Sequence, residues 1–432
     1  MVSRVIPVDP FDLVIFGGTG DLARRKILPG LFRRFCAGQM PDNSQIIGAA
    51  RSDMTPDAYR QMVAEAIAEF GGGGSCEAGT LEGFLKTISY VTTDAKGDGG
   101  WVELNGKMRD DTVRAFYFSV APSLFGDLAE RLHRFGLATP DSRIVVEKPF
   151  GHDLETARAL NATLAQHFHE TQIYRIDHYL GKETVQNHLM QLLCLIAMEP
   201  PAKFEPDAVR DEKLKVIRAL DPVEPHHIVR GQYAALAGQP GYRTDAGDDR
   251  SRTESFVALK CHISNWRWAG TPFYLRTGKR LKARASEIAV VFKDAPHSIF
   301  GADAGRHRNV LSIRLQPNEG MTLDVTIKEP GPGGMRLVDV PLDMSFADAL
   351  GPDAEEVPDA YERLIMDVIR GNQTLFMRGD EVEAAWAWTD PLIEGWSARG
   401  DVPKPYDAGS SGPEDALVLM HRDGRKWREI KP

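Results

Sequence analysis

Positive charge, cysteine and long apolar runs are all scarce in this chain of 432 residues, and each scarcity excludes something. Its 52 Lys and Arg residues are outnumbered by 61 Asp and Glu residues, which gives a net charge of -9. This balance argues against binding to nucleic acid or to an anionic membrane through bulk electrostatics, so an anionic ligand needs a local cluster of cations. No stretch approaches about 18 consecutive apolar residues, and the N-terminus lacks the apolar segment of a signal peptide, so we expect a soluble protein.

The chain has only four cysteines, which lie far apart in apolar or mixed contexts: Cys36, Cys76, Cys194 and Cys261. Their spacing matches neither a metal site nor a disulfide framework. We therefore predict reduced thiols, no metal site and a cytoplasmic location.

What is present, over residues 1–180, is an alternation of strand and helix patterns. Short apolar runs predict strands, and segments of helical periodicity separate them. The predicted strands are 13–16, 46–50, 115–120, 144–146 and 173–176, and the predicted helices are 21–35, 124–135 and 154–169. This order predicts an α/β, Rossmann-like N-terminal domain with a parallel, doubly wound sheet.

Beyond residue 180 the pattern changes. Residues 183–198 resemble one long apolar helix, and later segments alternate apolar and polar residues as half-buried antiparallel strands do. The predicted strands are 229–234, 254–264, 286–293, 309–316 and 321–328, with helices at 360–369 and 380–387. Residues 181–432 are therefore predicted to form an α+β C-terminal domain with a large, mainly antiparallel sheet.

A glycine-rich turn, GGTGDLA at 17–23, follows the first predicted strand and precedes a helix. Backbone N–H groups and the helix dipole bind a pyrophosphate at such a junction. The full G-x-G-x-x-G spacing is missing, so an ordinary glycine turn stays an alternative. The predicted cofactor contacts of this segment are Gly17, Gly18, Thr19, Gly20, Asp21, Leu22 and Lys26.

Arg51 follows the second predicted strand, where a dinucleotide fold that prefers NAD has an acidic residue for the ribose 2′-hydroxyl. A cation at this position suits a 2′-phosphate, and Arg24, Arg25 and Lys26 add positive charge nearby. We therefore predict NADP as the cofactor. Solvated surface charge is the alternative, and one residue does not exclude dual use of NAD.

Residues 175–183, RIDHYLGKE, concentrate an acid, an imidazole, a phenol and an ammonium where a strand ends. Strand ends in α/β folds present side chains to a crevice, so this run predicts an active site; a polar turn is the alternative. Asp177 can orient an imidazole, and His188 suits a general base that removes a hydroxyl proton as hydride leaves the same carbon. A polar histidine at the start of a helix is the alternative for His188. Three further residues suit an anion clamp: His178, Tyr179 and Lys182.

Two more segments carry cations at turns. Lys148, in the EKPFG segment that follows the 144–146 strand, can bridge the cofactor and a substrate hydroxyl or phosphate; an ordinary Pro-Gly turn after a strand is the alternative. Residues 276–284, RTGKRLKAR, place five cations around a glycine turn, which suits a phosphate. A solvated basic loop is the alternative for the second segment.

These motifs together resemble glucose-6-phosphate dehydrogenases. The N-terminal matches are GGTGDLARRK at 17–26, Arg51, EKPFG at 147–151 and RIDHYLGKE at 175–183. QNHLMQ at 186–191, residues 207–216, NWRWAGTPFYLRTGKRL at 265–281 and YERLIMDVIRGNQTLF at 361–376 extend the resemblance to nearly the whole chain. The resemblance implies NADP-dependent oxidation of glucose 6-phosphate at C1 to 6-phosphogluconolactone, in a homodimer or homotetramer.

The resemblance also implies a role for each matching residue. His188 corresponds to the general base and Asp177 to its orienting partner. The substrate-binding residues that it implies are His178, Tyr179, Lys182, Lys148, Lys279 and Arg284, and Lys148 also contacts the cofactor.

One departure from the family pattern affects activity. Family members have a further stretch of roughly fifty residues, with acids for the sugar hydroxyls, between the Gly-Lys-Glu and Gln-Asn-His motifs. Here only Thr184 and Val185 separate Glu183 from Gln186, so the second domain is shortened near 184–187, as an in-frame deletion would leave it. Asp177 and His188 stand 11 residues apart; on one helix they would be separated by about 16 Å, so the chain must turn back near Gly181 for them to meet.

The departure leaves three functions open. The chain is a glucose-6-phosphate dehydrogenase, or a member that binds NADP but has weak or no activity, or a related dehydrogenase of altered sugar specificity. The shortening itself favours reduced activity.

Overall fold

The computed structural model describes residues 6–71, 76, 79–176, 189–236, 238–294, 297, 308–332, 336–350 and 360–430. The chain divides into two compact units, each built from several segments. Unit 1 consists of Met1–His227, Lys260–Thr277 and Pro358–Asp401, and unit 2 of Ile228–Leu259, Gly278–Val357 and Val402–Pro432. These two units are defined by packing contacts and not by function. The division at residue 180 into a cofactor-binding and a substrate-binding domain stays a prediction.

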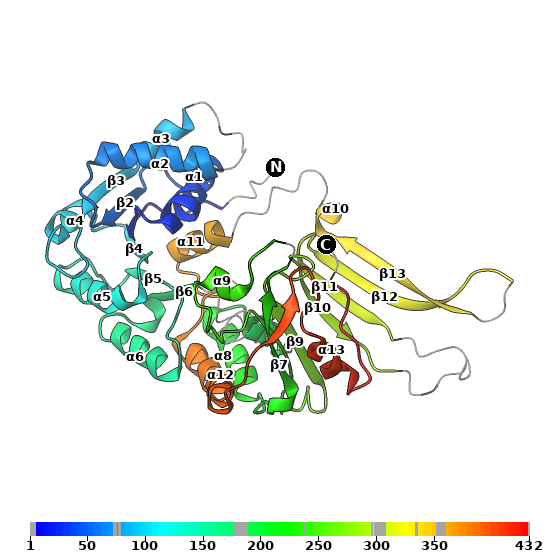
Figure 1. The fold of residues 1–432 in the computed structure, drawn as a ribbon. Helices are drawn as coiled ribbons and strands as arrows, with labels where there is room; N and C mark the ends of the chain where they lie inside the picture. Colours follow the sequence, from blue (N-terminus) through cyan, green and yellow to red (C-terminus); the bar gives the residue numbers. More distant parts are fainter. Residues whose placement is uncertain are drawn as a thin grey trace. The chain divides into compact units, whose positions relative to one another are not determined.

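Unit 1 contains a parallel six-stranded sheet with the strand order β3-β2-β1-β4-β5-β6 (Figure 1). This order is that of a doubly wound dinucleotide-binding fold, so the predicted α/β class is confirmed. The strands are β1 (Phe11–Phe16), β2 (Gln45–Ala50), β3 (Ile88–Thr92), β4 (Val113–Phe118), β5 (Arg143–Glu147) and β6 (Ile173–Ile176). Only β3 was not predicted, because its ISYVT sequence is short and mixes polar with apolar residues.

Helices cover both faces of this sheet, and β1 shows why a strand in such a sheet is apolar on both sides. Leu13 and Ile15 pack in one buried cluster, whereas Val14 and Phe16 pack in another on the opposite face. The first cluster involves the short π-helix η1 (Ala23–Ile27), α1 (Leu28–Cys36), α2 (Pro56–Phe70), α3 (Thr80–Lys86) and α11 (Ala360–Arg370). The second involves α4 (Trp101–Lys107), α5 (Phe125–Arg134), α6 (Leu154–Ala165) and α12 (Gly379–Arg399).

The second half of the chain contributes two four-stranded sheets, which confirms the predicted α+β class. The order β10-β11-β12-β13 is antiparallel throughout, and in the order β14-β7-β8-β9 the β14·β7 pair is parallel. Their strands are β7 (Ile228–Ala234), β8 (Phe256–His262), β9 (Pro272–Gly278), β10 (Ser286–Val291), β11 (Val310–Gln316), β12 (Gly320–Lys328), β13 (Leu337–Ser345) and β14 (Lys404–Asp407). The sequence did not predict β9, β13 and β14. Most positions of β13 and β14 are exposed, and all positions of β9 are half-buried, so none of the three alternates between buried and exposed residues.

The remaining helices are α7 (Met190–Ala197), α8 (Pro206–Arg218), α9 (Tyr242–Ala246), α10 (Phe346–Leu350) and α13 (Glu414–His421), with 3-10 turns η2 (Pro122–Leu124), η3 (Glu170–Gln172) and η5 (Pro225–His227). α7 accounts for the described part of the long helix predicted at 183–198. α12 runs to Arg399, well beyond the predicted end at residue 387, and it continues through Pro391. In the described ranges, no helix combines the length and the apolar character needed to cross a membrane.

A disulfide joins Cys36 and Cys76, so the expectation that all four cysteines are reduced was wrong. Cys36 is the last residue of α1, and Cys76 lies between α2 and α3, 40 residues further along the chain. Packing of α1 against α2 and α3 brings the two sulfurs together, and their spacing in the sequence does not reveal this. Cys194 and Cys261 are buried thiols, and burial raises the pKa of each to about 12.

We expect Asp153→Ala to lower the free energy of unfolding by about 1 kcal/mol at neutral pH, because Asp153 is the N-cap of α6. Its carboxylate accepts hydrogen bonds from the backbone N–H and the hydroxyl of Thr156, which lower its pKa below the usual value of 3.8. A lowered pKa in the folded state means that this stabilisation is present above the usual value and disappears as pH falls through the lowered one. Urea unfolding at pH 7 and at about pH 3 measures both; an equal loss at the two pH values would contradict the capping role.

Candidate active site

The glycine turn after β1 has a backbone that only glycine adopts easily. Gly17 has φ of +79°, and the N–H groups of Gly17 and Gly18 both donate to the carbonyl of Ala49, at 2.8 and 3.3 Å. A Cβ on Gly17 would lie 2.1 Å from the Ser119 carbonyl oxygen. The turn therefore lies in the crevice between the ends of β1, β2 and β4, where the strand order reverses and dinucleotides bind in such folds.

Two residues that support this turn were missed at the level of sequence. The buried Tyr59 of α2 donates its hydroxyl to the Gly18 carbonyl at 3.1 Å. Gly48 of β2 leaves the space for this ring, since a Cβ there would lie 2.2 Å from the Tyr59 ring. The available signal was a glycine inside a buried strand, which indicates close approach of another group.

Arg51 lies directly after β2, at the carboxyl edge of the sheet, and its side chain is exposed. It makes no hydrogen bond or ion pair with another described residue, although its charge and that of Asp94 interact at longer range. The backbone beside it is held by Tyr90, whose hydroxyl donates to the carbonyls of Ser52, at 2.6 Å, and Ala50, at 3.2 Å. A cation held at this edge with a free guanidinium can receive a phosphate.

Of the other predicted cofactor residues, Asp21 and Arg25 form an exposed ion pair of 2.8 Å, and Lys26 lies within η1. Arg24 has a buried Nε with no acceptor among the described residues. Thr19 and Leu22 complete the segment between β1 and η1.

Lys148 follows β5 at the same edge, and the Lys148–Pro149 peptide bond is cis. Its surroundings are firmly held: the Tyr117 hydroxyl of β4 donates to the Glu147 carboxylate, and the Trp386 indole of α12 donates to the Phe150 carbonyl at 3.1 Å. Burial, followed by the charge of Glu147, raises the pKa of Tyr117, so this phenol stays protonated. The chain on both sides of Lys148 is therefore held in place.

β6 is the last strand of the sheet, and it ends at Ile176, one residue before the predicted catalytic acid. Its carboxyl end lies on the same edge as those of β1, β2 and β5 because all six strands are parallel. Five predicted site residues lie outside the described residues: Asp177, His178, Tyr179, Lys182 and His188. The structure therefore brings together the glycine turn, Arg51 and Lys148, and it shows where the run at 175–183 begins.

The basic run at 276–284 belongs largely to unit 2, where two of its cations have carboxylate partners. Arg280, with φ of +50°, pairs with Asp245 at 2.8 Å, and Lys282 pairs with Glu429 at 2.5 Å. Lys279 and Arg284 make no side-chain polar contact with other described residues of the chain. Both are exposed, so these two cations are available to an anion.

Unit 1 has the features of a dinucleotide-binding dehydrogenase. The strand order places a crevice at the carboxyl ends of β1 and β4, and the turn in that crevice has no room for side chains at Gly17 and Gly18. The first N–H groups of the following helix, which begins at residue 21, have no acceptor within the helix, so they can bind a phosphate. The residues present fit a pyrophosphate.

Comparison with known proteins identifies the family. Residues 14–187 match the family model "Glucose-6-phosphate dehydrogenase, NAD binding domain", and residues 180–428 match "Glucose-6-phosphate dehydrogenase, C-terminal domain". The glucose-6-phosphate 1-dehydrogenase of Rhizobium meliloti is 47% identical, and the alignment covers 99% of this chain and 100% of that protein. The chain belongs to the glucose-6-phosphate dehydrogenase family.

Solved structures of the family are also similar in fold. A glucose-6-phosphate dehydrogenase in complex with glucose 6-phosphate has a TM-score of 0.88 and 30% identity, covering 99% of this chain and all of the other. The glucose-6-phosphate 1-dehydrogenase of Mycobacterium avium has a TM-score of 0.85 and 32% identity, covering 98% of this chain and 99% of the other.

Proposed function

We propose that this chain oxidises glucose 6-phosphate at C1 to 6-phosphogluconolactone with NADP, the first step of the oxidative pentose phosphate pathway. The observation that carries the proposal is that both halves of the chain match one family over nearly their whole length. The glycine turn, Arg51 and Lys148 at one edge of the sheet are consistent with it, since that edge binds the cofactor in such folds.

In the proposed mechanism, His188 removes the proton of the C1 hydroxyl, and Asp177 holds the imidazole in the orientation and tautomer that accept this proton. NADP, when bound, accepts the hydride from C1. Lys148 contacts both the cofactor and the substrate. The phosphate group is bound by the imidazole, phenol and ammonium groups of His178, Tyr179 and Lys182.

Lys279 and Arg284 are proposed as further substrate contacts. Their free side chains support this role, because the neighbouring cations Arg280 and Lys282 are already neutralised by carboxylates. Neutralised cations bind a second anion weakly, whereas an unpaired guanidinium or ammonium group keeps its full charge for a phosphate.

Turnover by the purified chain tests the proposal: absorbance of the reduced nicotinamide is followed with NADP and glucose 6-phosphate, beside glucose and fructose 6-phosphate as control substrates. NADP binding is titrated in parallel by calorimetry. Turnover with glucose 6-phosphate alone supports the proposal. Turnover only with another sugar phosphate would instead indicate an altered substrate specificity.

The second candidate function is a member that binds NADP but turns over slowly or not at all. It is favoured by the chain's length: the alignment with the Rhizobium meliloti enzyme runs over 492 positions, and this chain has 432 residues, so at least 60 positions (492 less 432) have no residue here. We propose that most of these fall between Glu183 and Gln186, where the acids for the sugar hydroxyls are expected. Binding of NADP without turnover would support this candidate, and a rate of roughly 10 per second would exclude it.

Arg51 is proposed to select NADP over NAD through the 2′-phosphate. We expect Arg51→Glu to weaken NADP binding by about 10- to 10²-fold, because a charge-assisted hydrogen bond worth about 1.5–3 kcal/mol is replaced by repulsion, while NAD binding stays within about threefold. Calorimetric titrations with both nucleotides measure this.

The matched control for that variant is Lys86→Glu, which makes the same change of net charge on the exposed surface of α3, where Lys86 pairs with Glu82 at 2.9 Å. It should leave both affinities unchanged. Equal weakening of NADP and NAD binding by Arg51→Glu would contradict the proposed role.

We also propose that the chain forms a homodimer or homotetramer through the sheet β10-β11-β12-β13 and that it works in the cytoplasm. Apolar side chains are exposed on this sheet, among them Leu342, at 58%, and Val291, at 53%, and such surface is usually covered by a partner. Sedimentation equilibrium tests the assembly; a monomer at micromolar concentration would exclude it. The cysteines do not support a cytoplasmic location, because Cys36 and Cys76 form a disulfide.

A further inference from the structure

The first turn of α12 is linked by buried charges to the start of α7. The Nζ of Lys213, on α8, lies 2.7 Å from Oε2 of Glu381, and their side chains are only 4% and 0% exposed. Lys213 also donates to Oε1 of Gln191, in the first turn of α7, at 3.1 Å. This is the one polar contact of the Gln191 side chain among the described residues, so the Lys213–Glu381 ion pair holds the first turn of α7 through Gln191.

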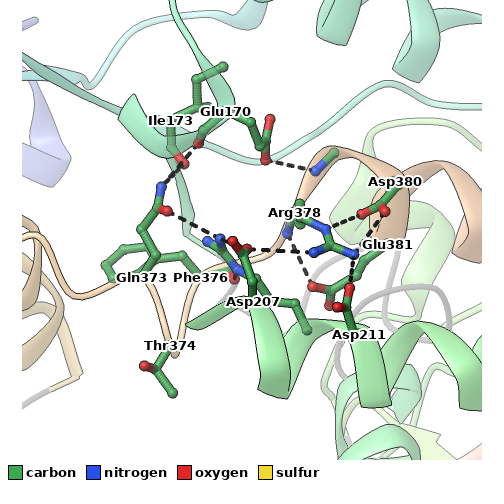
Figure 2. Close-up of polar contacts among 12 residues, drawn as sticks. Glu170, Ile173, Asp207, Asp211, Gln373, Thr374, Phe376, Arg378, Asp380 and Glu381 are labelled. Atoms are coloured by element: carbon green, nitrogen blue, oxygen red, sulfur yellow. Dashed lines mark hydrogen bonds and ion pairs between the residues drawn. The ribbon is translucent and has the colours of Figure 1, made fainter. Parts of the chain in front are cut away.

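The same turn of α12 is linked to the end of β6. The buried Arg175 of β6 donates to both carboxylate oxygens of Glu170, at 2.5 and 3.1 Å. Oε1 of Glu170 in turn accepts the backbone N–H of Gly379, the first residue of α12, at 3.0 Å (Figure 2). A Cβ on Gly379 would lie 3.2 Å from Nη2 of Arg175, so glycine permits this close approach.

Gln373 and Arg210 link the end of β6 to α8, and Figure 2 shows the contacts of Gln373 with Glu170 and Ile173. The amide nitrogen of Gln373 donates to the carbonyls of Glu170, at 3.1 Å, and Ile173, at 3.0 Å, and its oxygen accepts from Nη1 of Arg210 at 3.1 Å. The Nε of Arg210 donates to the Phe376 carbonyl at 3.2 Å. The contacts at the end of β6 and those at the start of α7 therefore meet on α8, which carries Arg210 and Lys213, and on the first turn of α12, which carries Gly379 and Glu381.

Stability alone does not account for this network. Burial raises the pKa of Glu381, and the charge of Lys213 opposes that rise, which shows the competition between desolvation and attraction in the pair. An apolar pair of similar volume is often as stabilising as a buried ion pair, so a gain in stability does not by itself explain the charges at this position. What the charges add is a defined position for the groups they bind.

The position that they define borders the proposed catalytic residues. Ile176 ends β6 directly before Asp177 in the sequence, and Gln191 follows His188 by three residues. We propose that Glu381 and Lys213 are positioning residues for the dehydrogenase reaction, which set the separation between the end of β6 and the start of α7, the described elements that flank the proposed acid and base in the sequence. This inference rests on the proposed function.

The decisive variant is the double replacement Lys213→Met with Glu381→Leu, which removes the ion pair but keeps apolar volume. Lys213→Met alone would leave a buried carboxylate without its cation, so it reports mainly on stability. In the double variant we expect kcat to fall by about 10- to 10²-fold, as misplacement of a catalytic group does. The KM for glucose 6-phosphate and the Kd for NADP should change less than about twofold. The unfolding midpoint should fall, because the Gln191 side chain and the Arg378 N–H lose their partners.

The matched control is Asp12→Leu with Arg109→Met, at the amino edge of the same sheet. Asp12 is fully buried and pairs with Arg109 at 2.5 Å. It also accepts a backbone N–H, that of Arg109, at 2.7 Å, just as Glu381 accepts the backbone N–H of Arg378 at 3.3 Å. The control should keep the wild-type kcat. Equal kcat values for the two double variants would overturn the inference.

Hydrogen exchange tests the positioning role of Lys213 and Glu381 without requiring turnover, so it is independent of the proposed function. Peptides spanning residues 173–176 and 190–197 should exchange faster in the Lys213/Glu381 double variant and not in the Asp12/Arg109 control. Unchanged exchange at both ends would overturn the inference, whatever the rate of turnover. If the wild type itself does not turn over, the proposed function fails, and the exchange comparison still decides this inference.

Discussion

Replacing His188 by alanine is expected to lower kcat for oxidation of glucose 6-phosphate by about 10²- to 10⁴-fold, the usual contribution of a general base. The proton of the C1 hydroxyl must leave as hydride departs, and without the imidazole only water accepts it. The KM for glucose 6-phosphate should change little, because the phosphate is bound by other residues. Steady-state rates with NADP at saturation measure both constants.

Asp177→Asn should show the same pattern with a comparably large loss of kcat, since the amide neither holds the imidazole in the accepting tautomer nor supplies the charge that stabilises the imidazolium. His226→Ala is the control: His226 is exposed, pairs with Glu224 at 3.2 Å, and should leave the rate unchanged. A His188→Ala enzyme within about threefold of the wild-type kcat would exclude His188 as the base and would require another group.

The second large effect is expected at the glycine turn, where Gly17→Ala should weaken NADP binding by about 10²-fold or more. Alanine at φ of +79° costs about 1–2 kcal/mol, and its Cβ would lie 2.1 Å from the Ser119 carbonyl oxygen, so the turn must move. A displaced turn forfeits about two charge-assisted hydrogen bonds to the pyrophosphate, each worth about 1.5 kcal/mol. Titration with NADP measures the loss, and thermal unfolding measures the accompanying fall in stability.

Gly38→Ala is the matched control for this prediction. Gly38 has φ of +69° in the turn after α1, but nothing lies within 4 Å of a Cβ built there. It therefore carries the backbone strain without the collision, and NADP binding should be normal. Equal affinity losses in the two variants would show that backbone strain, and not the close packing of the turn in the crevice, controls cofactor binding.

Local sequence predicted much of unit 1 because burial on both faces makes its strands largely apolar. β1, with six buried residues, and the glycine turn that follows it are readable in this way. β3 and β13 were missed because their polar or exposed residues break the alternation on which strand prediction depends. The contacts of Tyr59 with Gly18 and of Cys36 with Cys76 span 41 and 40 residues, so no local pattern contains them.

The basic run at 276–284 shows the same limit within a single motif. Its sequence places five cations in nine residues and does not distinguish among them. In the structure Arg280 is paired with Asp245, whereas Lys279 makes no side-chain polar contact with other described residues. Which cations remain available to an anion therefore depends on carboxylates that lie far away along the chain.

For the candidate site too, some features follow from the sequence and others only from the tertiary structure. The sequence by itself determined the chemistry: which residues titrate, which carry positive charge, and where glycine permits a phosphate to approach. The tertiary structure alone decided that Gly17, Arg51 and Lys148 share one edge of a sheet. It also decided that Glu381 and Lys213, which are 168 positions apart in the sequence (381 less 213), meet in the interior beside α7. The physical reason is that residue type follows from the sequence one position at a time, whereas proximity depends on packing of the whole chain.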